Sequence, residues 1–416
     1  MHYPSLVILC GMTLLLGLAG PAAGAVSPLW IEYATAGGDL SGVVISADDS
    51  TIVVGGAQLI CLTHEGQKRW TGWSGSHLAI SSDGDYILTS QGPNLRLISS
   101  AGTLLWERSI DIPVTDLSMV PNASVIAATS GGRLNTLTFT GEGIALNSTL
   151  SVNHIRVMPS GSRILVSTNK DIQLLDLNLK TVWSDANATQ DLVAAAPDGS
   201  SFVTVTNNRV RMYKGNGNIT WDKKFDAGYA QALAWSRDGS TIVVGRDDNN
   251  VQVLNREGTQ LFVANATDQI TSVAVSRDGN TIVAGSLDRK IYVYNHAGSM
   301  LGTFKTKTAI RFNSVAVTSD GMLIVVVDNS AAYGLSRSSF IEEATPRETV
   351  TGSSSETPEE TTAPPSPEIT TRKVTSRTPT LPTPYPTESE TTQTPLPLLI
   401  PLVALGFLIL CRQSKK

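Results

Sequence analysis

Three side chains that could bind a ligand recur at almost equal intervals along the chain. His77, Asp116 and His154 are separated by 39 and 38 residues, so they do not form one local motif. Imidazole and carboxylate groups ligate divalent metals and also bind polar ligands. If a repeated fold brings the three positions together, they could hold a metal ion or a polar ligand. The alternative is that they are unrelated polar residues at a wet surface.

Residues for other chemistries are scarce. The sequence contains no Gly-x-Ser-x-Gly nucleophile motif and no Cys/His pair with zinc spacing. Cys10 and Cys411 lie in terminal apolar segments, which leaves Cys61 alone and excludes an intramolecular disulfide framework. The net charge of −5 is not that of a nucleic-acid-binding protein. We therefore expect no catalytic residue, no bound metal and no nucleic-acid partner.

The elements that position these residues come from an internal repeat. A phrase of the form Ser-x-Asp-Gly-x-x-Ile recurs about every 39 residues, a period typical of propeller blades. Its Asp position is occupied in turn by Asp48, Asp83, Asn122, Ser160, Asp198, Asp238, Asp278 and Asp320. An Ile, or Phe202 in one unit, follows four residues later in every repeat. His77, Asp116 and His154 each lie six residues before this position, so they occupy one register of consecutive repeats.

Each repeat predicts four antiparallel strands. In the seventh unit alternating strands are expected at 272–276, 281–285, 290–294 and 300–304, with an Asp-Gly hairpin turn at 277–280. Four such strands per period form the blade of a β-propeller. An Asp in such a turn is expected for its backbone conformation, not for metal binding.

The number of repeats predicts an all-β propeller of eight four-stranded blades over residues 26–340. Seven blades remain the alternative if the third unit is not a true blade. A lone strand at 29–33 precedes the first repeat, and the last repeat lacks its fourth strand. We expect the N-terminal strand to complete the last blade and close the ring, because closure removes exposed strand edges.

The third and fourth strands resemble the tryptophan-docking repeat of quinoprotein-type propellers, in which a turn Gly precedes Trp by four residues. The matching pairs are Gly66/Trp70, Gly102/Trp106 and Gly217/Trp221, with departures at Leu179/Trp183, Gly258/Phe262 and Gly298/Gly302. The first two strands resemble WD-repeat-like propellers, although the terminal Trp-Asp dipeptide is missing. The resemblance implies that these aromatic residues stack between blades; ligand platforms are the alternative.

The same resemblance raises the question of a quinone cofactor. Quinone dehydrogenases of this type carry adjacent cysteines in the site, and this chain offers only Cys61 in the domain. We therefore expect no cofactor. Short turns at 55–58, 131–133 and 169–171 also lack the insertions from which propeller enzymes build sites. The sequence favours a non-catalytic binding or scaffold module; a quinoprotein-like or hydrolytic enzyme and a passive envelope protein are the alternatives.

The two ends predict an exported protein. Residues 1–25 resemble a signal peptide, with an uncleaved anchor as the alternative. Residues 341–395 contain 16 Thr, 10 Pro and 6 Ser, which predicts a disordered stalk. Residues 396–411 are apolar and predict a transmembrane or cleaved sorting anchor, followed by a basic cytoplasmic tail at 412–416. We expect the chain on the extracellular face of the membrane, N-terminus out; this combination is similar to envelope proteins of methanogenic archaea.

Two further features could contact partners. Trp73 lies between Gly72 and Gly75 in a predicted inter-blade loop, which makes it a candidate for an exposed aromatic contact. Five Asn-x-Ser/Thr sequons, about as many as chance provides, are possible glycosylation sites in an exported protein. They begin at Asn122, Asn147, Asn187, Asn218 and Asn265. The expected partner is a protein or glycan on one face of the propeller.

Overall fold

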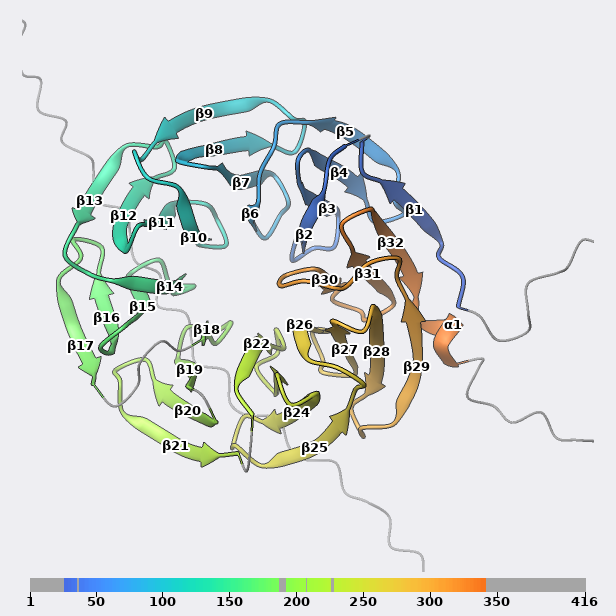
Figure 1. Cartoon of the computed structure of the whole chain (residues 1–416). Helices are drawn as coiled ribbons and strands as arrows, with labels where there is room; N and C mark the ends of the chain where they lie inside the picture. The colour runs from blue at the N-terminus through green and yellow to red at the C-terminus, as the bar shows by residue number, and fades with distance from the viewer. Residues whose placement is uncertain (1–25, 36, 187–191, 207, 226–227, 342–416) are drawn as a thin grey trace, which may run out of the picture. The chain divides into compact units, whose positions relative to one another are not determined.

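Each repeat folds into one antiparallel sheet, because its apolar runs alternate with turns that are short enough for hairpins. The computed structural model describes residues 26–341, except residue 36, residues 187–191, residue 207 and residues 226–227. These residues form eight four-stranded sheets in a ring around a central axis (Figure 1). The eight-bladed prediction is confirmed and the third unit is a true blade. The predicted signal peptide, stalk, anchor and basic tail lie outside the described residues.

The first four blades follow the repeats in order, from the innermost to the outermost strand. Blade 1 comprises β2 (Leu40–Ile45), β3 (Thr51–Gly56), β4 (Leu59–Thr63) and β5 (Lys68–Gly72). Blade 2 comprises β6 (His77–Ile80), β7 (Tyr86–Gln91), β8 (Asn94–Ser99) and β9 (Leu104–Ser109). Blade 3 comprises β10 (Val114–Met119), β11 (Val125–Ser130), β12 (Arg133–Thr138) and β13 (Gly143–Asn147). Blade 4 comprises β14 (Val152–Val157), β15 (Arg163–Thr168), β16 (Ile172–Asp176) and β17 (Thr181–Asp185).

The remaining blades complete the ring. Blade 5 comprises β18 (Leu192–Ala195), β19 (Ser201–Thr206), β20 (Arg209–Lys214) and β21 (Ile219–Lys224). Blade 6 comprises β22 (Ala230–Trp235), β23 (Thr241–Arg246), β24 (Asn250–Asn255) and β25 (Gln260–Asn265). Blade 7 comprises β26 (Ile270–Val275), β27 (Thr281–Ser286), β28 (Lys290–Asn295) and β29 (Met300–Lys305). Blade 8 comprises β30 (Val315–Val317), β31 (Leu323–Val327), β32 (Ala331–Ser336) and β1 (Trp30–Tyr33), and the helix α1 (Arg337–Ile341) follows β32.

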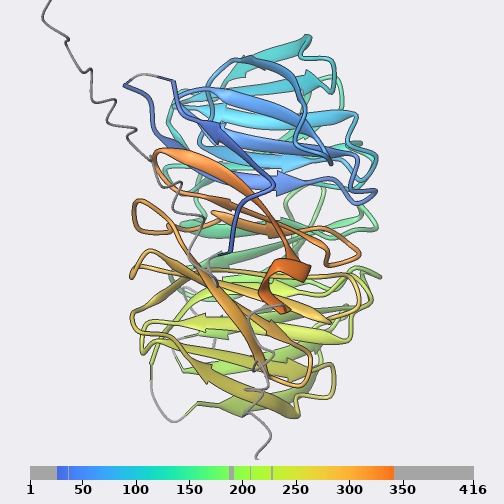
Figure 2. The same cartoon turned by 90° about the vertical axis from the view of Figure 1, so that its right-hand side faces the viewer.

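The N-terminal strand closes the ring as predicted. β1 pairs antiparallel with β32, with Trp30 opposite Gly334 and Tyr33 opposite Ala331. Figure 2 shows this strand in blue beside the orange strands of the last blade. Blade 8 therefore combines both ends of the folded segment, and its outer edge is supplied by the start of the chain. The part of the chain that the structure describes contains no helix long and apolar enough to cross a membrane.

The repeated Asp stabilises the hairpin turn between the first and second strand. Ser276 Oγ donates to Asp278 Oδ1 at 2.6 Å and accepts a hydrogen bond from Thr281 N at 2.9 Å. Asp278 Oδ1 also accepts one from Asn280 N at 3.0 Å, and Gly279 has a φ of 71°, where glycine is favoured. The same Ser–Asp bond occurs in four other turns, with Thr318 replacing Ser in the last one. The Asp therefore acts in the turn through its hydrogen bonds, while the following Gly takes the positive φ.

Neighbouring blades pack through their apolar faces and through the docking aromatic residues. Trp70 lies against Gly102 of the next blade, where a Cβ would come within 3.0 Å of its ring. Its Nε1 donates to the carbonyl oxygen of Ser100 at 2.8 Å, and Trp221 bonds to the carbonyl of Arg256 in the same way. The further pairs are Trp106/Gly141, Trp183/Gly217, Trp221/Gly258, Phe262/Gly298 and, across the closure, Trp30/Gly66. Each aromatic therefore joins one blade to the next, as expected for inter-blade packing.

The two joints that lack a docking aromatic residue are filled differently. In blade 3 the tryptophan position, opposite Thr136, is occupied by Ala145, and the turn position of blade 4 is occupied by Leu179 at a φ of 62°. Ala145 packs on the apolar cluster that contains Leu179, so a small residue and a large one have exchanged places. In blade 7 the position is Gly302, and the fully buried Phe340 of α1 packs with Leu301 and Phe304 of the same strand. The departures from the docking pattern are thus compensated.

Candidate functional site

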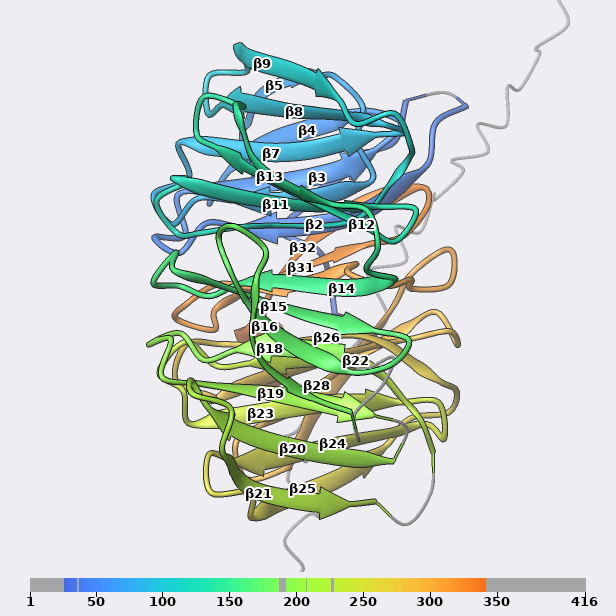
Figure 3. The ribbon, with the colours of Figure 1, turned by 90° about the vertical axis from the view of Figure 1, so that its left-hand side faces the viewer.

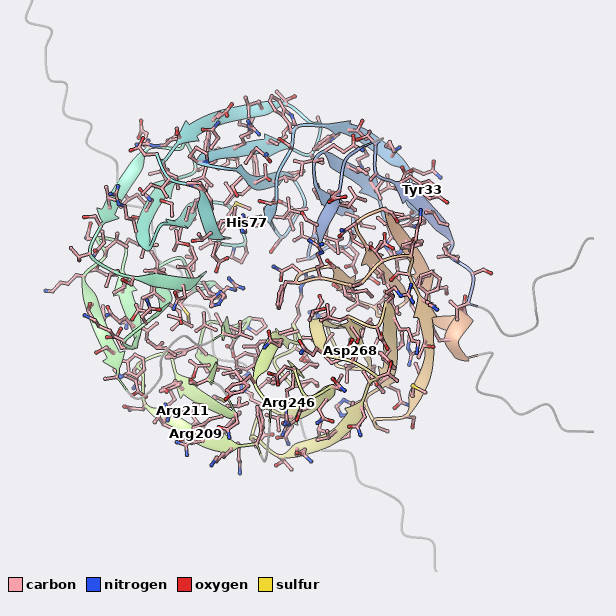
Figure 4. The ribbon with its side chains drawn as sticks, viewed as in Figure 1. Tyr33, His77, Arg209, Arg211, Arg246 and Asp268 are labelled. Atoms are coloured by element: carbon pink, nitrogen blue, oxygen red, sulfur yellow. The ribbon has the colours of Figure 1, made fainter. Side chains whose placement is uncertain are left out.

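His77, Asp116 and His154 lie on the innermost strands of three consecutive blades, as the repeat predicts. Figure 4 shows His77 on the inner side of the ring. The Nδ1 atom of His154 is 3.7 Å from Asp116 Oδ2. The Nδ1 atom of His77 is instead 3.1 Å from Ser90 Oγ in its own blade. Only Asp116 and His154 are therefore in direct contact.

The carboxylate of Asp116 is engaged by groups of the next blade. It accepts hydrogen bonds from Ile155 N at 3.0 Å and from Arg156 Nη1 at 3.2 Å, and one from Leu117 N at 2.8 Å. Burial raises the pKa of this carboxyl, but the charge of Arg156 and the bonds from His154 and Ile155 outweigh burial and hold the pKa below its ordinary value. Asp116 thus links blades 3 and 4, which Figure 3 shows one above the other.

The geometry gives the metal hypothesis no support. Within residues 26–341, outside the omitted positions, no group of three His, Cys, Asp or Glu side chains could hold a metal ion. Burial lowers the pKa of His77, although the charge of Asp116 opposes this, so the imidazole is neutral at pH 7. The sequence placed these residues correctly at the same position of consecutive repeats. It did not show that the side chain of Asp116 points toward blade 4, where Ile155 N bonds to it.

Trp73 follows β5 and is 39% exposed. Its Nε1 donates to the carbonyl oxygen of Gly102 at 3.2 Å, and the Arg96 guanidinium lies 5.7 Å from the ring centroid. Part of the indole therefore belongs to the junction of blades 1 and 2. The remaining surface is accessible, as the sequence predicted.

The sequon residues lie mostly at the surface. Asn122, Asn218 and Asn265 are exposed, and Asn147 is half-buried, with its Oδ1 accepting hydrogen bonds from Thr149. Asn187 lies outside the described residues. Exposure makes glycosylation sterically feasible at the first three sites, which remains a prediction.

A small pocket lies between blades 3 and 4. It has a volume of about 420 Å³ and is lined by Thr115, Gly131, Gly132, Ser151, Val152, Asn153 and Asn169. Asn153 Nδ2 donates to Asn169 Oδ1 across it at 2.9 Å. The lining contains hydroxyl, amide and backbone groups but no charged side chain and no histidine.

A stronger candidate lies on the loop face, which we define as the face formed by the inter-blade loops and by the turns between second and third strands. Tyr229, Leu287 and Phe312 are 57%, 38% and 55% exposed on this face. They belong to blades 6, 7 and 8, and we call them with Arg289, Lys307 and Arg311 the blade 6–8 surface. Over blades 2 to 4 the described residues of the same face are mainly Gly, Ser, Pro and Asn, with the exposed cations Arg133 and Lys170. Trp73, at the junction of blades 1 and 2, is the other large exposed apolar side chain described here, so most of these side chains lie over blades 6 to 8.

Backbone hydrogen bonds tie each inter-blade loop of the blade 6–8 surface to an adjacent turn between a second and a third strand. Asp247 N donates to the carbonyl oxygen of Tyr229 at 3.0 Å. Leu287 N donates to the carbonyl of Gln269 at 3.1 Å, and Ile310 N to that of Ser286 at 3.3 Å. Sequence reasoning missed this surface because its loops have no hydrophobic period. The only signal was the length of the loop between β29 and β30.

Comparisons with known proteins agree with this architecture. The C-terminal WD40 domain of Sif2 superposes with a TM-score of 0.65 at 12% identity, covering 75% of this chain and 98% of that one. This is a WD40-like propeller fold. Sqt1 from Chaetomium thermophilum gives 0.62 at 13% identity, covering 75% of this chain and 100% of its own. Sqt1 bound to the N-terminus of the ribosomal protein L10 gives 0.60 at 13%, covering 72% and 97%.

Sequence comparisons add less. The profile of a family of unknown function (DUF5711) matches residues 177–334, which lie within the propeller. No curated protein sequence matches the chain. The quinoprotein and archaeal-envelope resemblances therefore remain expectations from the sequence, while the WD40-like fold is established by the structural neighbours.

Proposed function

We propose that this protein is a non-catalytic propeller that binds a protein partner through the blade 6–8 surface. The observation that carries the proposal is the gathering of Tyr229, Leu287 and Phe312 with exposed arginines on one side of the loop face. Tyr and Arg are enriched among the residues that dominate binding energy at protein interfaces. The printed description of one structural neighbour, Sqt1 bound to the N-terminus of a ribosomal protein, supports such a role.

Several features of the possible reactive groups support a non-catalytic role. Asp116 is engaged by Ile155 and Arg156, and the pocket between blades 3 and 4 lacks charged side chains. Burial raises the pKa of the Cys61 thiol to about 11, although the charge of Arg69 opposes this, so the thiol is unreactive at neutral pH.

We also propose that the propeller is displayed outside the cell and tethered by its C-terminus. The apolar, small-residue pattern before Val26 and the apolar residues 396–411 followed by cations support this location. A buried, unreactive Cys61 is compatible with an oxidising compartment. Amino-terminal sequencing of the protein from its native membrane is expected to start at Val26. A mature chain that starts at Met1 would contradict the cleaved signal.

Site-specific photo-cross-linking tests the binding surface. A photoreactive amino acid replaces Phe312 in one variant and Met322 in another, because Met322 is 46% exposed in a turn on the opposite face. In intact cells we expect a discrete cross-linked protein from position 312, and the product should weaken when Tyr229→Ala is added. No specific product from position 312, or equal products from both positions, would refute the proposed surface.

A further inference from the structure

Three cations project from the blade 7 and 8 part of the loop face. Arg289 lies in the turn between β27 and β28, and Lys307 and Arg311 lie in the loop between β29 and β30. All three residues are exposed. None of them forms an ion pair with another residue that the structure describes. Phe312 follows Arg311 directly, so apolar and cationic groups alternate on this part of the surface.

The carboxylates beneath these cations are engaged by internal hydrogen bonds. Asp328 is only 2% exposed and accepts bonds from the backbone N–H groups of Lys307, Thr308, Ser330 and Ala331 at 2.8 to 3.0 Å. Burial raises its pKa, but these bonds outweigh burial and keep the pKa below its ordinary value. The carboxylate therefore fixes the loop from below and is not available to pair with Lys307 or Arg311 at the surface.

Asp288 is held in a similar way in the neighbouring turn. Its side chain is 12% exposed and accepts hydrogen bonds from the Tyr292 hydroxyl at 2.5 Å, from Lys290 N at 2.9 Å and from Thr267 Oγ1. The other carboxylates nearby are the half-buried Asp268, labelled over blade 7 in Figure 4, and the exposed Asp39 in the loop between β1 and β2, where Leu40 N donates to the carbonyl oxygen of Asn329 at 3.1 Å. The layer that a partner would contact thus presents three cations against two acids, of which one is partly covered.

The backbone holds the cationic groups in a fixed arrangement. Thr306 N donates to the carbonyl oxygen of Arg289 at 2.8 Å, which ties the start of the β29–β30 loop to the β27–β28 turn. At the other end of the loop, the carbonyl oxygen of Asn313 accepts a hydrogen bond from Val43 N of blade 1 at 3.0 Å. A surface that is ordered before binding loses less conformational entropy when a partner binds.

We propose that the segment bound by Leu287, Arg289, Lys307, Arg311 and Phe312 is an acidic stretch of a partner protein that also carries an apolar side chain. Asp and Glu of the partner would pair with the cations, and guanidinium groups favour carboxylates because two N–H donors can bind both oxygens. The apolar side chain would cover Phe312 and Leu287. This inference rests on the proposed protein-binding function and adds the chemistry of the partner.

Peptide binding to the purified full chain in mild detergent tests the charge preference. Two labelled peptides share the same Leu and Phe positions, and the remaining positions are all Glu in one and all Lys in the other. Fluorescence anisotropy should show that the Glu peptide binds at least about tenfold more tightly, and that raising salt from about 50 to about 300 mM weakens its binding. Equal affinity for the two peptides, or no binding of the Glu peptide, would overturn the inference.

Charge-removing variants locate the binding. Lys307→Ala combined with Arg311→Ala should weaken Glu-peptide binding by about tenfold or more, since each rim charge contributes to electrostatic complementarity. The matched control combines Arg133→Ala with Lys170→Ala, which removes two exposed cations from the same face over blades 3 and 4. An equal loss in the control would show non-specific attraction and overturn the inference.

Two further experiments distinguish an acidic partner protein from other occupants of the surface. Residues 341–395 contain nine acidic and four basic residues, so the chain's own segment could occupy the surface. If replacing those acidic residues by Gln raises peptide affinity about tenfold, the occupant is this segment and not a partner. In the cross-linking experiment, a product at Phe312 whose linked segment is neutral or basic would overturn the acidic partner but leave the proposed function standing. The absence of any product would refute the proposed function itself.

Discussion

Replacing Trp221 by Ala tests whether the docking aromatics hold neighbouring blades together. Complete burial of a tryptophan removes about 150–250 Å² from water, which corresponds to about 4–6 kcal/mol. Trp221 is only partly buried, but its Nε1 also bonds to the carbonyl oxygen of Arg256. We therefore expect Trp221→Ala to lower the free energy of unfolding by about 3–4 kcal/mol, measured by equilibrium denaturation in urea. The exposed Trp73, replaced by Ala, should cost about 1 kcal/mol or less.

The joint between blades 3 and 4 supplies a more demanding form of the same test. There the native pair is Ala145 and Leu179, and Leu179 tolerates a φ of 62°. Gly258 has a φ of 77°, and a Cβ on it would lie 2.6 Å from the Trp221 ring. Gly258→Leu alone should therefore destabilise the protein by about 2 kcal/mol or more.

Combining Trp221→Ala with Gly258→Leu places a small and a large residue as in the native Ala145/Leu179 pair. The double variant should be less destabilised than the sum of the single variants, with a coupling free energy of about 1–3 kcal/mol. Strictly additive effects would show that Trp221 and Gly258 do not form one joint, and would refute the packing argument. A Trp221→Ala variant as stable as the unchanged protein would refute it as well.

The other predictions concern closure, the inner seam and acid stability. Deleting residues 26–35 should lower the melting temperature and cause aggregation, because the open edge of β32 can pair with other chains; a deletion that melts like the intact protein would contradict closure. Asp116→Ala should cost about 1–3 kcal/mol in urea denaturation, because Ile155 N loses its partner, whereas Asp85→Ala at the surface should cost little. Hydrogen bonds from Ser276 and Asn280 outweigh burial and hold the pKa of Asp278 below its ordinary value. The contribution of Asp278 to the free energy of unfolding is therefore complete above about pH 4 and is lost as pH falls through the folded-state pKa. Between neutral and low pH, the melting temperature of Asp278→Asn should fall less steeply than that of the unchanged protein.

The blade pattern was predictable because it depends on local chemistry. The Ser-x-Asp-Gly phrase carries its own hydrogen bonds, so each turn and its two strands follow from adjacent residues. The closing strand was predictable from the count of strands in the last repeat. Trp30 was not recognised as a docking residue, because its partner Gly66 belongs to another blade and follows only from the closed ring.

Position within the repeat did not predict the contacts of the candidate site residues. The repeat placed Asp116 on an inner strand, but in a radial sheet the side chains of that strand alternate between the two adjacent blades. Asp116 consequently faces blade 4, while Leu117 packs with blade 2. Phe312 and Arg311 lie in a loop whose conformation depends on contacts with blades 7, 8 and 1, and no periodic signal in the sequence reports such contacts.

The joint of Ala145 and Leu179 has a consequence for the order in which the blades assemble. Most docking pairs consist of a tryptophan and a glycine turn, so during folding a blade that carries a tryptophan could pack against the glycine turn of the wrong blade. If blade 3 packed against such a glycine turn, Ala145 would leave a cavity the size of an indole. If a blade with a tryptophan packed against blade 4, the indole would clash with Leu179. Near-identical repeats are prone to misassembly and domain swapping. The Ala145/Leu179 pair thus favours the packing of blade 3 against blade 4 over other pairings. One correct joint then sets the order of all the other blades in the ring.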